Sequence, residues 1–183
     1  MCQLSSGTAR HRAKLVCMRI SLALLFAFCG SLESQPRQSL MFVPDNLKPP
    51  SNERPTLLAH ADGDQIYVCD GSSWMLSRPD AKLFTDSGKQ IGSHFAGPTW
   101  EYSDGSRVMA KPVATATPNP NSISWLLLKA TDHQGEGVMK RVTSIQRLST
   151  KGGRAPATGC DAQHKGQEAR SHYTALYLFY SGS

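Results

Sequence analysis

The chain has 183 residues, a formal net charge of +6 and five cysteines. Residues 1–34 hold four Lys/Arg and one acid, so the rest of the chain carries 16 basic and 13 acidic residues, a net charge of +3. These basic residues are scattered and form no cluster of the kind that marks a nucleic-acid surface, so we expect no nucleic-acid partner. The remaining length suffices for one hydrophobic core and is too short for two.

The N-terminal segment has the pattern of a secretory signal peptide. Four Lys/Arg residues precede the apolar segment ISLALLFAFC (20–29), and small residues follow it. As a helix this segment would cover about 15 Å, half of a bilayer core, so we expect no transmembrane span in the mature chain. A buried helix of a cytosolic domain is the alternative. We expect residues 1–34 to be the signal-peptide region. Within it, we expect Met18 to be the true start of translation.

The signal peptide predicts an exported protein, in the periplasm or outside the cell. Cys29 would suit lipid attachment, but Phe28 stands where a small residue is usual, which argues against a lipoprotein. Cys69 and Cys160 are the two cysteines that remain after the signal peptide. In an oxidising compartment such a pair indicates a disulfide. Two free buried thiols and a metal site are the alternatives.

Residues 35–55 contain five prolines and predict an extended arm, followed by a single β-rich domain over 56–183. The first predicted strands are 56–61 and 65–70, joined by a hairpin turn at Asp62-Gly63. Further strands are expected at 73–76, 82–85, 90–95, 99–102, 107–116, 124–131, 138–149 and 172–180. The tetrads SDGS (103–106) and PNPN (118–121) predict a turn and a loop.

The spacing of these segments predicts the fold class. No segment of twelve or more residues shows the 3.6-residue period of a helix, and one short helical turn is expected over 159–167, with Asp161 near its start. Roughly nine or ten short strands at regular spacing are typical of a mainly β protein. We therefore expect a single antiparallel β-barrel or β-sandwich.

Five segments carry a resemblance to a known family. They are QIYVC (65–69), LFTDSGKQIGSHFAGPTWEYSDGSRV (83–108), WLLLKA (125–130), IQRLSTKGG (145–153) and APATGCDAQHKGQEARSHYTALYLFY (155–180). In this order they resemble the signature segments of domain-of-unknown-function family 3455, a family of exported bacterial and fungal proteins. The resemblance covers residues 43–181 and implies an exported single domain that carries the Cys69 and Cys160 pair. It implies no activity.

Residues 94–108 concentrate the candidate site side chains, His94, Trp100, Glu101, Asp104 and Arg107. In one interpretation they surround a pocket, where His94 and Glu101 do acid–base work, Trp100 stacks on a ring and Arg107 holds an anion. In the other they form an ordinary hairpin, with Trp100 in the core, Glu101 facing solvent and Asp104 in a turn. Turn chemistry favours the hairpin, and the unusual GPTWE run (97–101) keeps the site as a hypothesis.

The sequence contains no recognisable cofactor or metal motif. The histidines show neither H-x-x-H nor H-E-x-x-H spacing. Cys160, His164 and Glu168 could share one face of a helix, but Gly166 weakens that helix and the cysteine suits a disulfide. No G-x-S-x-G elbow occurs, and no G-x-G-x-x-G follows a strand. We therefore expect neither a metal nor a cofactor.

Three functional hypotheses follow. The favoured one is a non-catalytic module that binds a small molecule or a carbohydrate, including a polysaccharide, with Trp74, Trp100 and Trp125 as the first candidate contacts. The alternative is a cofactor-independent enzyme in which His94 and Glu101 act as acid–base residues in one cavity. The third is an envelope or wall protein that acts through protein contacts at an exposed apolar patch.

Overall fold

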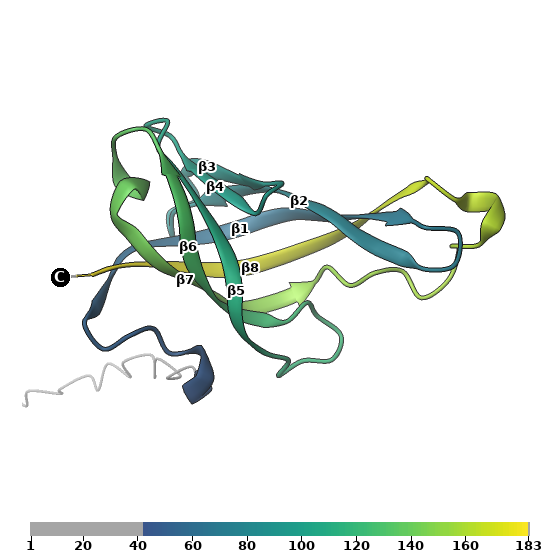
Figure 1. The fold of residues 1–183 in the computed structure, drawn as a ribbon, viewed down its shortest axis with the longest axis horizontal. Helices are drawn as coiled ribbons and strands as arrows, with labels where there is room; N and C mark the ends of the chain where they lie inside the picture. Colours follow the sequence, from purple (N-terminus) through teal and green to yellow (C-terminus); the bar gives the residue numbers. More distant parts are fainter. Residues whose placement is uncertain (1–41, 183) are drawn as a thin grey trace, which may run out of the picture. The chain divides into compact units, whose positions relative to one another are not determined.

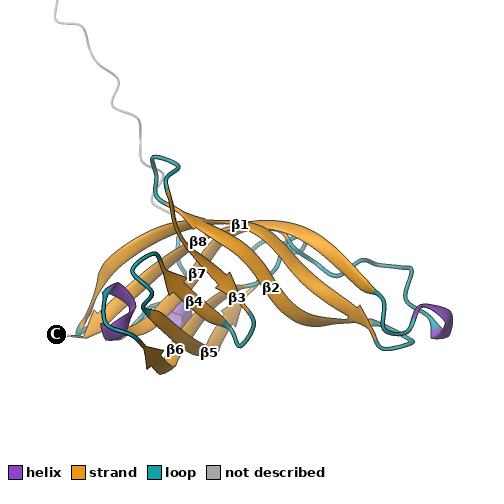
Figure 2. Cartoon of the chain, turned by 90° about the horizontal axis from the view of Figure 1, so that it is seen from above, coloured by secondary structure: helices purple, strands orange, loops and turns teal. Residues whose placement is uncertain are grey.

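The computed structural model describes residues 42–182, and the predicted signal peptide lies outside the described residues. Eight strands form one antiparallel sheet in which each strand pairs with the next and the last pairs with the first, closing a barrel (Figures 1 and 2). The strands are β1 (Glu53–Cys69), β2 (Trp74–Phe84), β3 (Gln90–Phe95), β4 (Thr99–Tyr102), β5 (Arg107–Ala116), β6 (Trp125–Gln134), β7 (Val142–Gly152) and β8 (Glu168–Gly182). The predicted mainly β class is confirmed, in its barrel form.

The strands number eight, rather than nine or ten, because two pairs of predicted strands are continuous. β1 runs through Asp62 and Gly63 while pairing with β2 and β8, so the predicted hairpin turn is wrong. A Cβ at Gly63 would lie 2.3 Å from the carbonyl oxygen of Asp80 on β2. Glycine is needed there because the two backbones approach closely, not because the chain turns. The predicted strands 73–76 and 82–85 are likewise parts of one strand, β2.

The barrel interior combines large aromatic and small aliphatic side chains. Trp100, Tyr173, Tyr177 and Phe179 are at most 1 % exposed, and each belongs to the main core cluster. The same cluster contains the alanines 59, 61, 81, 110 and 175. Pairing large residues with small ones is how a small barrel fills its interior with side chains.

One end of the barrel is closed by η2 (Val138–Arg141), a 3₁₀ turn in the connection between β6 and β7. Its Met139 side chain is fully buried in the core cluster. The turn is held by the β4–β5 connection, because Val138 N donates to Asp104 Oδ2 at 2.9 Å and Met139 N donates to Ser106 Oγ at 3.0 Å. Protein therefore fills this end of the barrel.

The residues before β1 pack on the outer face of β6 and β7. The 3₁₀ turn η1 (Asp45–Leu47) places Leu47, which is fully buried, against Leu127 and Leu148. Gln146 Nε2 donates to the carbonyl oxygen of Leu47 at 2.6 Å. Part of the predicted arm is thus an integral part of the packed unit, and β1 begins at Glu53, within the range expected to be arm.

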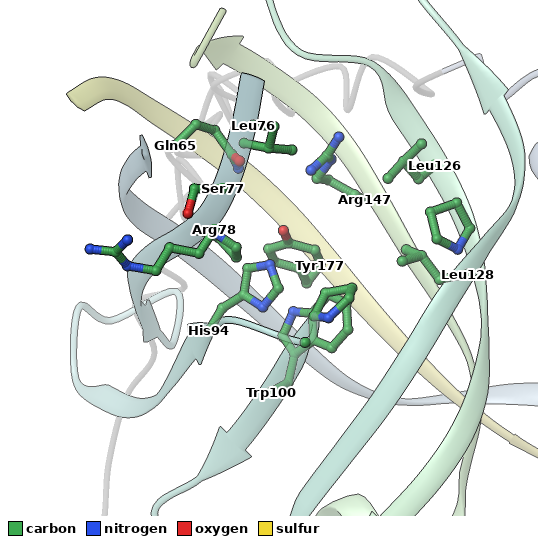
Figure 3. A pocket seen from close by; sticks show the side chains of 14 residues that line it. Gln65, Leu76, Ser77, Arg78, His94, Trp100, Leu126, Leu128, Arg147 and Tyr177 are labelled. Atoms are coloured by element: carbon green, nitrogen blue, oxygen red, sulfur yellow. The ribbon is translucent and has the colours of Figure 1, made fainter. Parts of the chain in front are cut away.

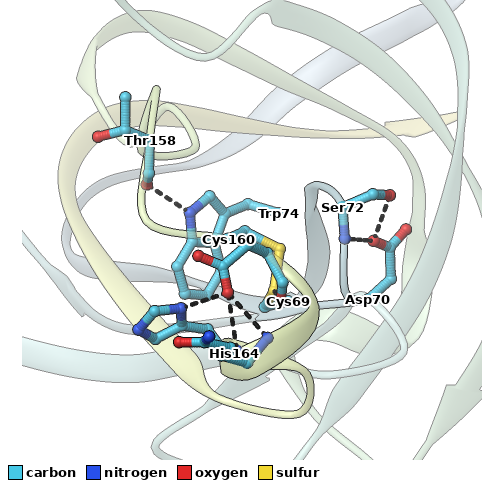
Figure 4. A network of polar contacts seen from close by, with 9 residues as sticks. Cys69, Asp70, Ser72, Trp74, Thr158, Cys160 and His164 are labelled. Atoms are coloured by element: carbon cyan, nitrogen blue, oxygen red, sulfur yellow. Dashed lines mark hydrogen bonds and ion pairs between the residues drawn. A yellow bond between two sulfur atoms is a disulfide. The ribbon is translucent and has the colours of Figure 1, made fainter.

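β1, β2 and β8 extend beyond the other strands at the opposite end (Figure 1). A disulfide between Cys69 and Cys160 joins the end of β1 to the β7–β8 connection, with the two Cα atoms 5.4 Å apart (Figure 4). The expected helical turn is present there as η3 (Ala162–His164), and the side chain of Asp161 caps it by accepting from the backbone N–H of Gln163 and His164. Among residues 42–182 no helix is long and apolar enough to cross a membrane.

Candidate functional site

A cavity of about 220 Å³ lies next to the β3–β4 connection, at the other end of β4 from the connection that holds Met139. Figure 3 shows the side chains that line it. The cavity is found here because β3 and β4 end at the short connection 96–98, while β1 and β2 continue past them. Every strand of the barrel contributes to its lining. The polar lining residues are Gln65, Ser77, Arg78, His94, Arg147 and Tyr177, and the others include Trp100, leucines and prolines.

His94 and Trp100 form the inner wall of the cavity. They are direct register partners on β3 and β4, so their side chains enter the barrel side by side. The two rings stack with centroids 4.1 Å apart, and the ring of Tyr177 meets His94 edge-on at 5.4 Å. His94 Nδ1 lies 2.9 Å from the carbonyl oxygen of Thr99. A carbonyl oxygen can only accept, so Nδ1 carries the proton and Nε2 is left as the acceptor.

The inner wall is uncharged at neutral pH. Burial lowers the pKa of His94 from 6.5 to about 3, although the hydrogen bond to Thr99 opposes this shift. Burial also raises the pKa of the Tyr177 hydroxyl, which therefore stays protonated. Neutral imidazole and phenol groups can donate and accept hydrogen bonds without balancing a charge. The formal charge in the cavity comes from its two arginines.

Buried polar atoms gather at this cavity. The indole Nε1 of Trp100 and the hydroxyl of Tyr177 are buried, and neither has a hydrogen-bond partner at normal distance among the residues that the structure describes. Weaker hydrogen bonds with Tyr173, Arg147 and Trp100 are among the causes that lower the pKa of Tyr177 against the larger effect of burial. The hydroxyl of Tyr173, four residues earlier on β8, is buried in the same way, but Tyr173 does not line the cavity. Gln65, only 2 % exposed, adds a side-chain amide to the lining (Figure 3). Buried polar groups in folded proteins are nearly always hydrogen-bonded, to protein, to water or to a ligand, so these atoms can bond a molecule that enters the cavity.

The structure separates the residues that the sequence grouped together. His94 and Trp100 line the cavity, whereas Glu101 is on the outer face, where its Oε2 lies 2.6 Å from Nε of Arg107. Successive side chains on β4 point to opposite faces, so Trp100 inside requires Glu101 outside. The expected acid–base pair is therefore corrected: His94 and Glu101 lie on opposite sides of the sheet and share no cavity.

Asp104 lies at the closed end of the barrel and has a structural role there. Its Oδ1 accepts from the backbone N–H of Ser106 at 2.8 Å, and its Oδ2 accepts from that of Val138 at 2.9 Å. Hydrogen bonds from the Ser106 side chain, from Val138 N–H and from Ser106 N–H hold the pKa of the Asp104 carboxyl below its usual value. Neither Asp104 nor Arg107 lines the cavity.

Two of the three tryptophans lie elsewhere. Trp74 Nε1 donates to the carbonyl oxygen of Thr158 at 2.9 Å, beside the disulfide (Figure 4). Trp125 packs with the outer cluster that contains Leu47. Of the three tryptophans named as first candidate contacts, Trp100 is the one that lines this cavity.

Sequence reasoning found only His94 and Trp100 of the lining residues, and missed among others Gln65, Arg147 and Tyr177. Arg147 could have been predicted from strand alternation. Residues two apart on a strand point to the same face, and Ile145, two positions earlier, is a fully buried core residue. An arginine on the inward face of a strand points to a buried charge. Gln65 and Tyr177 lie far away in the sequence, and only the closure of β8 onto β1 brings them to the same cavity.

The residues considered for a metal site are engaged otherwise. Cys160 is in the disulfide, His164 Nδ1 lies 2.6 Å from Asp161 Oδ1, and Glu168 pairs with Arg78. Within residues 42–182 no three His, Cys, Asp or Glu side chains gather closely enough to hold a metal ion.

Comparison with known proteins supports the family resemblance. A search of curated proteins and a search of solved structures found no match. Residues 49–181 match the family described as "Protein of unknown function (DUF3455)". The matched range contains the cavity-lining residues and both bonded cysteines. The chain therefore belongs to the DUF3455 family of proteins of unknown function, as its ordered signature segments indicated.

Proposed function

We propose that this protein is exported and binds a small organic molecule, without catalysis, in the open end of its barrel. The observation that carries the proposal is the cavity at His94 and Trp100, whose wall holds buried polar atoms that have no partner at normal hydrogen-bond distance among the described residues. Ligand sites are typically concave and mostly apolar, with a few convergent polar groups. Export rests on the signal-peptide pattern and on the disulfide, which suits an oxidising compartment.

A small ligand with an apolar part fits the lining better than a polysaccharide does. Sugar binding commonly uses an aromatic ring face that is open to the ligand, but Trp100 is 1 % exposed and is covered by His94. The cavity walls are mainly the apolar side chains of Leu76, Leu126 and Leu128 together with prolines. Burial of an apolar body against such walls supplies the main driving force for binding.

Filling the cavity from its rim tests this proposal. Leu76 lines the cavity and is 58 % exposed, so Leu76→Trp can occupy the opening without disturbing the core. Val113→Trp is the matched control, because Val113 is similarly exposed at 53 % and does not line the cavity. Protein expressed from the full-length chain is purified and compared by native mass spectrometry and by thermal shift against a panel of small aliphatic and aromatic compounds.

We expect the wild type and Val113→Trp to retain or bind the same compound, and Leu76→Trp to lose it. The proposal fails if the wild type shows no bound compound and no thermal shift with the panel. It also fails if Leu76→Trp binds as well as Val113→Trp, because the ligand would then lie outside this cavity.

A further inference from the structure

Arg147 brings an unbalanced positive charge to the cavity. It lies on β7 and is partly buried, and its guanidinium donates from Nε and Nη2 to the carbonyl oxygen of Ser124, at 3.1 and 2.9 Å. Another neighbour in the cavity is the neutral hydroxyl of Tyr177, whose pKa is raised by burial and is lowered in part by a weaker side-chain hydrogen bond with Arg147. Among the residues that the structure describes, Arg147 has no carboxylate within ion-pair distance. A guanidinium has five N–H donors, so part of this one is free to bind an anion.

The other groups at the cavity leave this charge uncompensated. No aspartate or glutamate is among the lining residues. The second lining arginine, Arg78, is already paired, because its Nη1 lies 2.8 Å from Oε1 of Glu168. His94 is neutral at physiological pH, and the charge of Arg147 is one of the causes that lower its pKa. A partly desolvated cation without a counter-charge is costly, so this site favours an occupant with one negative charge.

The side chains around Arg147 determine which chemical groups the rest of a bound molecule can carry. Leu126 and Leu128 line the cavity on β6, the strand that pairs with β7, and Leu126 is the direct register partner of Arg147. Trp100 Nε1 and the Tyr177 hydroxyl add hydrogen-bond donors that have no partner at normal hydrogen-bond distance within residues 42–182. A planar carboxylate suits a guanidinium, because its two oxygens can accept two parallel N–H bonds.

Building on the proposed function, we infer that the ligand is a small organic monoanion, a carboxylate with an aliphatic or aromatic body. The carboxylate contacts Arg147, and the body contacts Leu126 and Leu128. Recognition is reversible binding with no covalent step. The positive charge is specific to Arg147, since Arg78 is neutralised by Glu168.

Matched pairs of charged and neutral probes test this inference. Benzoate and hexanoate are compared with benzamide and hexanamide by isothermal titration calorimetry on the purified full-length product. The variants are Arg147→Met, which keeps the length of the side chain but removes its charge, and Arg147→Lys, which keeps the charge. Arg107→Met is the control, because Arg107 carries the same charge on the outer face. Circular dichroism confirms that each variant is folded.

We expect at least one carboxylate to bind the wild type about 10- to 100-fold more tightly than its amide, the range of one charge-assisted hydrogen-bond pair. Arg147→Met removes this preference, Arg147→Lys retains part of it, and Arg107→Met leaves it unchanged. Equal affinity for carboxylate and amide, or an unchanged preference in Arg147→Met, overturns the inference and leaves the proposed function standing. If no carboxylate and no amide binds, the inference is overturned, and the proposed function is decided by the separate comparison of Leu76→Trp with Val113→Trp.

Discussion

The imidazole of His94 lies flat on the indole of Trp100, with ring centroids 4.1 Å apart and planes 10° from parallel. The two residues are opposite each other on β3 and β4, so the stack is a cross-strand pair on the inner face of the barrel. Such contacts between planar rings commonly add about 0.5–1.5 kcal/mol beyond simple burial. Burial, rather than the stack itself, keeps this histidine neutral, because solvent cannot reach the ring to stabilise an imidazolium.

The burial of His94 predicts a loss of stability in mild acid. Its pKa is about 3 in the folded chain, against 6.5 for an unperturbed histidine. Between these values the unfolded chain binds a proton that the folded chain does not, so the contribution of His94 is complete above pH 6.5 and decreases as the pH falls toward 3. From pH 7.5 to pH 5 this single group contributes a decrease of about 2 kcal/mol. Urea unfolding of the wild type and His94→Gln at both pH values measures it. We expect the variant to lose less stability than the wild type by that amount, and an equal loss in both would contradict the prediction.

The disulfide predicts a large difference between oxidised and reduced protein. Cys69 and Cys160 are 91 residues apart, and closing so long a loop restricts the unfolded chain strongly. We expect Cys69→Ala/Cys160→Ala to lower the free energy of unfolding by about 2–5 kcal/mol. Urea unfolding with and without reductant tests this. Reductant should bring the wild type to the midpoint of the double variant and leave the double variant unchanged. A double variant as stable as the oxidised wild type would refute the prediction.

The segment before β1 is predicted to contribute to stability through one side chain. Leu47 is fully buried against Leu127 and Leu148, so Leu47→Ala should cost about 2–4 kcal/mol through lost burial and the cavity left behind. Phe42→Ala in the same segment is the control, because Phe42 is 84 % exposed and should change stability by less than about 0.5 kcal/mol. The free energy of unfolding of both variants in urea provides the comparison. Equal losses of stability in the two variants would mean that the segment before β1 does not pack on the outer face of the barrel.

Local patterns in the sequence were sufficient to predict the bounds of the two strands in the hairpin at the centre of the chain. β4 (Thr99–Tyr102) and β5 (Arg107–Ala116) have the predicted bounds, because the turn residues Ser103–Ser106 act within the segment itself. The same kind of reasoning failed at Asp62-Gly63, where a dipeptide typical of turns lies inside a continuous strand. Gly63 is required by the close approach of Asp80, a contact between strands that no local pattern contains.

The candidate site was likewise predicted only in part, because local sequence patterns do not determine which side chains line the cavity. Of the candidates that the sequence grouped in residues 94–108, His94 and Trp100 line the cavity, whereas Glu101, Asp104 and Arg107 do not. Strand alternation determines only that neighbours such as Trp100 and Glu101 point to opposite faces. It does not determine which face is inside, because this depends on how the sheet curves and closes.

The amino-acid sequence by itself determined the sheet class, the strand–turn–strand unit at residues 99–116 and the family to which the chain belongs. These follow from turn residues, apolar alternation and the order of short segments, all of which act over short distances along the chain. Only the tertiary structure decided that Gln65, His94, Arg147 and Tyr177 share one cavity and that Glu101 does not. The physical reason is that pairing β8 with β1 closes the sheet, and closure brings together side chains from distant strands according to register and face.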